Sequence, residues 1–497
     1  MTFISVEFYL LLAIVAAVYF IVPLKFRWFI LLLGSLAFYV FQGIEMLPLM
    51  LLSSFVGWLF GLCMGKVYER DPKQKKKAKL FSGIAIVILI GMLAFVKSSR
   101  YMPESVASKI IVPIGISYYT FSIVSYLIDV YRRKYQAEPN FLKFTLFTAY
   151  FPKVLQGPIA RYDKLMPQLA EGHKFEYGRF CFGLQLMLWG FFKKLVIADR
   201  LSIFTNTVFL DAANMSGSVI LVAAIFATLE LYCDFSACMD LASGMSQIFG
   251  IELEQNFDHP FFSKSAAEFW RRWHITLGAW FKDYVYMPIV TSPRMAKLLQ
   301  MVKKHFGTRC GKSVMAFVPL SVVWVLTGVW HGTGRAYVVW GIYWGAMIII
   351  SQIFAPEIKK LNAFLHINVE SESWKIFQMV RTFALFSIGR MITIPNSLST
   401  TALMFRKIFL DFRPWQLVDE SLYTFGLDRK NFLLALFLFF ILWSVSMLQE
   451  KGSLRLRISE YNVVFRWMIY YIAIIAIIVL GIYGPGYDAS SFVYIGY

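Results

Sequence analysis

The sequence predicts an all-α polytopic membrane protein with about 11–13 transmembrane helices. Of its 497 residues, 58% are hydrophobic and only 16% are charged, and the mean hydropathy is +0.60. A soluble domain of this length would carry roughly 25% charged residues. The apolar residues are spread along the chain in stretches of about 17–24, each close to the ~20 residues that span a bilayer as a helix. We therefore expect a single integral membrane domain over residues 1–497.

Twelve segments are long and apolar enough to be candidate spans. The candidate spans lie near 7–24, 28–43, 46–65, 79–97, 109–130, 178–199, 217–233, 314–331, 335–354, 375–395, 432–449 and 464–483.

Basic residues in the loops predict the orientation of the chain, because Lys and Arg gather on the cytoplasmic side of a membrane. Lys25 and Arg27 follow the first span, residues 66–79 form a lysine-rich loop after the third, and Arg132–Lys134 follow the fifth. These alternate loops place the N-terminus outside the cytoplasm. The C-terminus is also predicted outside, because basic residues precede the last span: Lys451, Arg455, Arg457 and Arg466.

The middle of the chain does not divide into simple transmembrane spans. Residues 141–175 and 234–290 are apolar but are interrupted by Pro, Gly and charge. Irregular backbone at membrane depth occurs only where protein or a water-filled cavity covers it. We therefore expect re-entrant or interfacial helices around a cavity here, and an external interfacial stretch over residues 398–430.

Composition and motifs exclude several classes of protein. The net charge of +19 lies in short loops and forms no continuous basic face, so no nucleic-acid partner is expected. The five cysteines are scattered without a CxxC pair, which predicts neither a disulfide framework nor a metal site. No GxSxG, Walker A, GxGxxG or HExxH pattern is present. The sequence also has no obvious internal repeat, which argues against a transporter built from inverted repeats.

The first unusual window is Glu268–Pro288, which contains His274. On a continuous helix the side chains of Trp270, Trp273, His274, Leu277 and Phe281 would share one side. An interfacial helix anchored by aromatic residues explains the Trp and Arg residues of this window. It does not explain a histidine among the aromatics, so His274 is a candidate functional residue.

The second window is Val322–Arg335, which places His331 at the end of a predicted span. The 19 residues from Lys312 to His331 would extend about 28 Å as a helix, which puts His331 near the outer surface unless the helix is tilted or broken. The glycines around it would let a substrate approach the ring, although a histidine that caps a helix end is the alternative. A neutral imidazole can act as the general base in acyl transfer to a hydroxyl.

Asp234 is a third candidate, because it follows the apolar segment 217–233. Its carboxylate could orient a histidine or bind a hydroxyl group. Pairing with a nearby arginine is the simpler alternative.

Together these windows resemble the membrane-bound O-acyltransferase family, in its bacterial branch of polysaccharide O-acetyltransferases and D-alanyl transfer proteins. The motifs occur in the family's order over residues 110–335, which we therefore expect to be the catalytic core. They are Val112–Phe121, Phe151–Arg161, Leu184–Arg200, Asp234-Phe-Ser236, Asn256-Phe257, Phe269–His274 and Trp330-His-Gly332.

The resemblance implies roles for particular residues. His331 corresponds to the family's catalytic histidine and His274 to its active-site partner. Substrate-binding roles are expected for Trp330, Trp273, Asp234, Ser236 and Asn256. The resemblance also implies a ring of helices around a central tunnel.

Within the branch, the windows Lys193–Arg200 and Arg271–His274 are more similar to the polysaccharide O-acetyltransferases. This implies acetyl-CoA as the cytoplasmic donor, no bound cofactor, an extracytoplasmic polysaccharide as acceptor, and a separate SGNH-type partner that completes the transfer. The expected location is the bacterial plasma membrane, in contact with its lipids. D-alanyl transfer to teichoic acids is the alternative, and a non-enzymatic glycan transporter is a second alternative.

Overall fold

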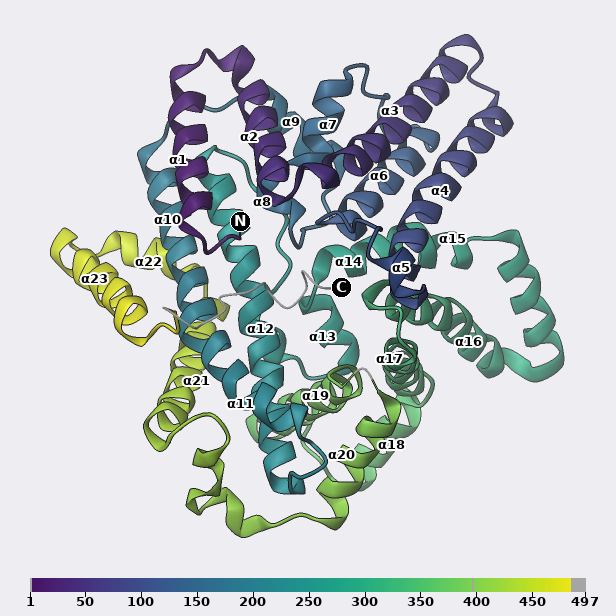
Figure 1. Cartoon of the computed structure of the whole chain (residues 1–497). Helices are drawn as coiled ribbons and strands as arrows, with labels where there is room; N and C mark the ends of the chain where they lie inside the picture. Colours follow the sequence, from purple (N-terminus) through teal and green to yellow (C-terminus); the bar gives the residue numbers. More distant parts are fainter. Residues whose placement is uncertain (1, 396, 484–497) are drawn as a thin grey trace. The chain divides into compact units, whose positions relative to one another are not determined.

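A computed structural model describes residues 2–395 and 397–483 (Figure 1). The described residues form helices and no named β-strand; a single isolated bridge joins Phe257 and Trp273. The predicted all-α membrane class is confirmed. The chain divides into two compact units, so the expectation of a single domain stays a prediction.

The first unit contains Met1–Phe192 and Phe235–Gln255, together with Tyr483. Polar N-caps begin several of its helices; the Asn140 side chain, for example, accepts hydrogen bonds from the backbone of Leu142 and Lys143. Its helices are α1 (Val6–Ile21), α2 (Arg27–Gln42), α3 (Leu47–Arg70), α4 (Lys75–Ser98), α5 (Glu104–Ala107), α6 (Ile116–Tyr131), α7 (Phe141–Ala149), α8 (Phe151–Val154), α9 (Tyr162–Glu171) and α10 (Tyr177–Phe191).

The second unit contains Lys193–Asp234 and Asn256–Ile482. It holds the π-helical turns η4 (Phe192–Ala198) and η6 (Lys282–Tyr286) and the 3-10 turns η5 (Pro260–Phe262), η7 (Pro414–Leu417) and η8 (Glu420–Thr424). Its α-helices are α11 (Asp199–Leu210), α12 (Gly217–Ile248, which continues into the first unit), α13 (Ala266–Arg272), α14 (Ile275–Phe281), α15 (Met287–Val290), α16 (Pro293–His331), α17 (Arg335–Ile353), α18 (Ala355–Phe364), α19 (Glu372–Thr393), α20 (Leu398–Leu410), α21 (Arg429–Glu450), α22 (Leu454–Glu460) and α23 (Val463–Leu480).

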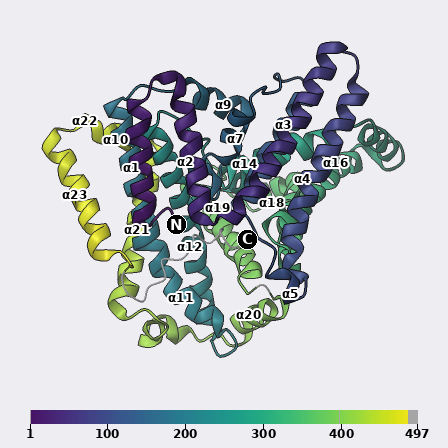
Figure 2. The same ribbon diagram turned by 45° about the horizontal axis from the view of Figure 1, so that its top comes forward.

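Within the described residues, nine helices are long and apolar enough to cross a membrane. Helix α23 is the extreme case, because no residue in its apolar window is buried by protein. Figures 1 and 2 both show α23 at the periphery of the second unit, beside α22. The length and exposed apolar surface of α23 are those of a helix that faces lipid.

Three predicted spans are more than ten residues longer in the structure. The span predicted at 178–199 continues through η4 and α11 to Leu210. The span predicted at 217–233 continues as a helix to Ile248, because a buried lysine pairs with Asp234 and the charge no longer ends the apolar segment. The span predicted at 314–331 begins at Pro293, where the Ser292 side chain caps the helix, and it bends at Gly307. Its first turns are basic and exposed, so hydropathy alone did not reveal them.

Helices α16 and α17 cross closely within the second unit. A Cβ atom added at Gly341 would lie 2.4 Å from the carbonyl oxygen of Trp324, and one at Gly328 would lie 2.4 Å from the carbonyl oxygen of Tyr337. Glycine at both positions therefore allows the two backbones to approach. The crossing lies near the C-terminal end of α16, whose last residue is His331.

Candidate active site

His274 lies at a break between two short helices, and this differs from the continuous helix predicted for its window. Helix α13 stops at Arg272, Trp273 is extended, and His274 has a left-handed backbone with φ of 48°. Helix α14 then begins at Ile275. A left-handed conformation is uncommon for a residue other than glycine, and such residues are concentrated at functional sites.

The break exists because the segment around Asn256 pairs with it. The backbone N–H of Ile275 donates to the carbonyl oxygen of Asn256 (3.1 Å), and that of Asp258 donates to Arg272 (2.9 Å). The Asn256 side-chain oxygen accepts from both the backbone N–H (3.1 Å) and the hydroxyl (2.7 Å) of Thr276. Asn256 therefore caps the start of α14 and holds the backbone of His274.

His331 is the last residue of α16, and its ring is buried. Its Nδ1 lies 2.8 Å from the carbonyl oxygen of Thr327, one turn earlier in the helix. Because a carbonyl oxygen can only accept, Nδ1 carries the proton in this hydrogen bond. In the neutral ring, Nε2 is then the basic nitrogen.

The two histidines come together in the second unit. Their ring centroids are 6.3 Å apart and the ring planes are nearly perpendicular, at 88°. His274 is 1% exposed and His331 is 5% exposed. Trp330 lies 5.8 Å from the His274 ring, and Trp340 of α17 lies 4.8 Å from the His331 ring. The sequence predicted both histidines as candidates, and the structure makes them neighbours in an aromatic enclosure.

Burial determines the charge of His274. Desolvation, and to a lesser degree the nearby His331, lowers the pKa of the His274 imidazole well below its usual value of 6.5. The ring is therefore neutral near neutral pH. A neutral imidazole has one N–H donor and one acceptor nitrogen, which suits it to donate a hydrogen bond to a carbonyl oxygen.

Trp273 and Trp330 occupy different surroundings. Trp273 is buried among aromatic rings of the second unit, with Phe257 at 5.0 Å and Phe386 at 4.8 Å between centroids. Trp330 is also buried but lies against both histidines, 4.9 Å from the His331 ring. Trp330 is therefore the tryptophan of this pair that shares the enclosure of the two imidazoles.

Asp234 is paired, although with a lysine and not with the arginine considered from sequence. The Nζ atom of Lys194 lies 2.6 Å from Asp234 and 3.0 Å from Asp199, and all three side chains are buried. Lys194 lies in the π-helical turn η4, a geometry that is common at functional sites. Ser236 follows on α12 within the first unit and is buried there.

Several residues of the site had no clear signal in the sequence. Thr327, Thr276 and Trp340 contribute through a backbone carbonyl, a backbone N–H with a hydroxyl, and a ring contact, respectively. Thr327 precedes His331 by four residues, so helical spacing could have indicated it. The partners of Asn256 and Lys194 lie too far along the chain to be identified from spacing.

The glycines beside His331 also differ from expectation. A Cβ atom at Gly332 would lie 2.3 Å from the Tyr337 ring, and Gly328 packs against α17. Both glycines therefore serve close packing between α16 and α17, whereas the sequence suggested that they open a path for substrate.

One group of possible metal ligands occurs among the described residues, formed by Asp258, His259 and Glu450. The carboxylate of Glu450 is bound by the guanidinium of Arg272, which competes with a cation. We therefore assign no metal to this group.

Comparison with known proteins identifies the family of the chain. Residues 46–303 match the MBOAT, membrane-bound O-acyltransferase family, so the match includes His274 and ends before His331. The chain is 29% identical over 428 residues to a probable alginate O-acetylase AlgI of Pseudomonas syringae pv. tomato, covering 84% of this chain and 76% of that protein.

Two further relatives differ in the group that their names specify. A peptidoglycan O-acetyltransferase of Helicobacter pylori is 26% identical over 367 residues, covering 67% of this chain and 66% of that protein. A teichoic acid D-alanyltransferase of Bacillus subtilis is 27% identical over 266 residues, covering 53% of this chain and 64% of that protein. The family match spans more than half of the 497 residues. The chain belongs to the membrane-bound O-acyltransferase family and is an acyltransferase.

Proposed function

We propose that this protein moves an acetyl group from cytoplasmic acetyl-CoA to a hydroxyl acceptor, for the O-acetylation of an extracytoplasmic polysaccharide. The observation that carries the proposal is the buried, perpendicular pair of His274 and His331 with ring centroids 6.3 Å apart. Acyl transfer to a hydroxyl needs a base for the hydroxyl proton and a donor for the developing oxyanion. The two imidazoles are suited to supply one group each.

His331 is assigned as the base. Its Nδ1–H is engaged by the Thr327 carbonyl oxygen at 2.8 Å, so Nε2 has the lone pair that can accept a proton. The same hydrogen bond holds the ring in one orientation at the end of α16. Trp340 packs against the ring and limits the access of water.

His274 is assigned as the group that polarises the acyl carbonyl. Burial keeps its ring neutral, so it can donate one N–H to the carbonyl oxygen without forming an ion pair. Its backbone is held by the hydrogen bonds from Ile275 and Thr276 to Asn256. A donor held in place before reaction does not need to reorganise as negative charge develops.

The proposed reaction proceeds through a tetrahedral intermediate. The acceptor oxygen attacks the thioester carbonyl carbon while His331 Nε2 takes the hydroxyl proton. The oxyanion of the tetrahedral intermediate accepts a hydrogen bond from His274. When the intermediate collapses, the carbon–sulfur bond breaks and the leaving thiolate takes the proton back from His331. The products are an ester and a free thiol.

Acetyl is preferred over D-alanyl as the transferred group. The relative named as an alginate O-acetylase aligns over 84% of this chain, whereas the relative named as a teichoic acid D-alanyltransferase aligns over 53%. D-alanyl transfer to teichoic acids is retained as the second candidate because that relative shares the family. A separate SGNH-type partner at the outer face is proposed to complete the transfer to the glycan.

The test compares His331→Ala and His274→Ala with His305→Ala, in which the lost ring is exposed on α16. Membrane accumulation is checked by immunoblot, and ester-linked acetate and ester-linked D-alanine in the cell envelope are measured separately. We expect His331→Ala to reduce acetylation by at least about 100-fold, the usual contribution of a general base, and His305→Ala to leave it unchanged.

Two results would overturn this proposal in different ways. Undiminished acetylation in an accumulated His331→Ala protein would remove His331 from the chemistry. Loss of ester-linked D-alanine with acetate unchanged in a deletion strain would replace acetyl by D-alanyl as the transferred group.

A further inference from the structure

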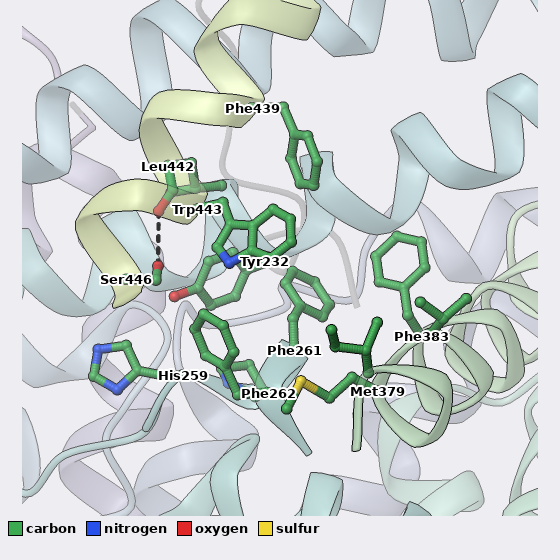
Figure 3. A pocket seen from close by; sticks show the side chains of 13 residues that line it. Tyr232, His259, Phe261, Phe262, Met379, Phe383, Phe439, Leu442, Trp443 and Ser446 are labelled. Carbon is green, nitrogen blue, oxygen red and sulfur yellow. Dashed lines mark hydrogen bonds between the residues drawn. The ribbon is translucent and has the colours of Figure 1, made fainter. Parts of the chain in front are cut away.

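A cavity of about 270 Å³ lies in the second unit, beside the segment that carries the candidate active site (Figure 3). Four elements enclose it: α12, η5, α19 and α21. Its lining consists almost wholly of aromatic and aliphatic side chains. They include Tyr232, Phe261, Met379, Phe383, Leu442 and Trp443.

The few polar groups of the lining do not make the interior polar. The Ser446 hydroxyl donates to the carbonyl oxygen of Leu442 within α21, at 2.8 Å. In Figure 3 the His259 ring lies at one end of the cavity-lining side chains, and Phe383 lies at the other end. The interior is therefore suited to hydrocarbon, with polar groups at one end.

The cavity is continuous with the lipid-facing surface of the second unit. Three lining residues on α19 and α21 are also strongly exposed, Ile376 at 57%, Val380 at 62% and Trp443 at 48%. Helix α21 is one of the candidate membrane spans. Its exposed apolar residues therefore face acyl chains, and the cavity opens among them.

Charged residues of both signs lie next to His259, at the polar end of the cavity. His259 Nδ1 lies 3.2 Å from Asp258 and 3.8 Å from Glu450. The guanidinium of Arg272 pairs with both Glu450 and Glu268. Two of these three carboxylates are paired with the guanidinium, and the third, Asp258, lies beside the His259 ring. This rim matches a headgroup that carries an ammonium group.

We propose that this cavity holds one acyl chain of a phosphatidylethanolamine molecule, with the headgroup at the rim formed by Asp258, Arg272 and Glu450. Lipid tails are as apolar as leucine, so transfer from the bilayer into the cavity gains little hydrophobic free energy. The gain comes from two other sources. The chain fills a void that would otherwise forfeit dispersion contacts. The ammonium donates a charge-assisted hydrogen bond to Asp258, whereas Glu450 stays paired with Arg272.

The size of the cavity fits this occupant. An apolar cavity of about 150 Å³ accepts a benzene ring, so 270 Å³ accommodates a longer hydrocarbon segment. A whole phospholipid does not fit in that volume. One chain enters while the rest of the lipid stays in the bilayer.

The site has a structural link to the candidate catalytic segment. The Tyr232 ring lies 6.1 Å from Trp273, and the Phe261 ring lies 6.5 Å from Phe269. Trp273 immediately precedes His274. The bound acyl chain therefore packs against the aromatic side chains that contact the segment carrying this histidine. The existence of the lipid site does not depend on the proposed acetyl chemistry.

The experiment measures the thermal stability of the purified full-length protein in detergent, with and without added phosphatidylethanolamine. Ser446→Phe introduces a ring into the cavity from α21, and Met379→Trp introduces a larger side chain from α19. Ser444→Phe is the matched control, because it places the same ring two residues away on α21, at a position that does not line the cavity. Native mass spectrometry counts the lipid that remains bound.

Added phosphatidylethanolamine should raise the Tm of the wild type and of Ser444→Phe by at least about 3 °C, as expected for a ligand that binds only the folded state. The two filled variants should show no rise and should retain no lipid. An equal rise in all four proteins would overturn the proposed site.

The headgroup is tested by replacing phosphatidylethanolamine with phosphatidylglycerol. The wild type should show the smaller Tm rise with phosphatidylglycerol, and Asp258→Asn should reduce the difference between the Tm rises that the two lipids produce. Equal rises of the wild type with both lipids would overturn the ammonium assignment. None of these measurements uses acyl transfer, so failure here is distinguishable from failure of the proposed function.

Discussion

The hydrogen bond from His331 Nδ1 to the carbonyl oxygen of Thr327 decides which nitrogen of this ring can act as a base. His274 likewise depends on a residue that takes no part in the proposed reaction. The Asn256 side chain accepts two hydrogen bonds from Thr276 and so holds the left-handed backbone of His274. At the scale of single residues, the site consists of two imidazoles and of the groups that orient them.

Asn256 is predicted to act as a positioning residue. Asn256→Ala removes an acceptor at the start of α14, which costs about 1 kcal/mol of stability, as the loss of a helix cap does. We expect kcat for acetyl transfer to fall while KM changes little, because His274 shifts and the remaining binding surface does not. Asn256→Asp should restore kcat, since its carboxylate can also accept from Thr276. An unchanged kcat in Asn256→Ala would contradict this role.

The neutral state of His274 predicts how stability depends on pH. The unfolded chain protonates this histidine near pH 6.5, whereas burial lowers the pKa in the folded protein, which stays unprotonated. The unfolded state therefore binds more protons below pH 6.5, and the free energy of unfolding falls as pH falls, by at most about 1.4 kcal/mol per pH unit.

This effect can be isolated with His274→Gln, which cannot titrate. Its Tm in detergent should decline less steeply than that of the wild type between about pH 6.5 and 5. If the Tm declines equally with pH in the two proteins, His274 does not contribute to the pH dependence of stability.

At the scale of elements, the crossing of α16 and α17 determines the position of His331. Gly328 and Gly341 bring the two backbones together one turn before α16 ends. Tryptophans of α16 and α17 then pack around Trp270 of α13, which lies 5.0 Å from Trp324 and 5.5 Å from Trp340. This cluster connects the helix before His274 with the two helices that carry and cover His331.

Gly341→Ala is predicted to disrupt the crossing. The new Cβ would lie 2.4 Å from the carbonyl oxygen of Trp324, so α16 must shift. Overpacking of this kind costs about 1–3 kcal/mol, and a displacement of His331 near 1 Å lowers kcat by about 100-fold. Gly91→Ala in α4 is the control, because a Cβ there meets nothing within 4 Å. Equal kcat in the two variants would contradict the proposed role of the crossing.

At the scale of the whole molecule, hydropathy predicted most of the helices, and charge predicted their orientation. The helices α1–α4, α17, α21 and α23 begin and end within several residues of the predicted spans. Helix formation in a membrane depends on local apolar length, which explains this agreement. The orientation stays a prediction, with both termini outside the cytoplasm.

Cysteine labelling in intact cells tests this orientation. On a Cys310→Ser background, which removes an exposed thiol, a membrane-impermeant maleimide should label Glu45→Cys in intact cells. Lys76→Cys and Lys451→Cys should react only after the cells are permeabilised, because both lie in loops predicted to be cytoplasmic. The reverse pattern would invert the topology without changing the fold.

The sequence by itself determined the membrane class, most of the spans and the two histidines, because apolar length and an ionisable residue in an apolar segment are local properties. Only the tertiary structure decided the break at Trp273–His274, the lysine partner of Asp234 and the contact between the two imidazoles. Each of these depends on chain segments far apart in the sequence. Backbone pairing, ion pairing and close packing are decided by which segments meet in space, and that information is absent from any single window of the chain.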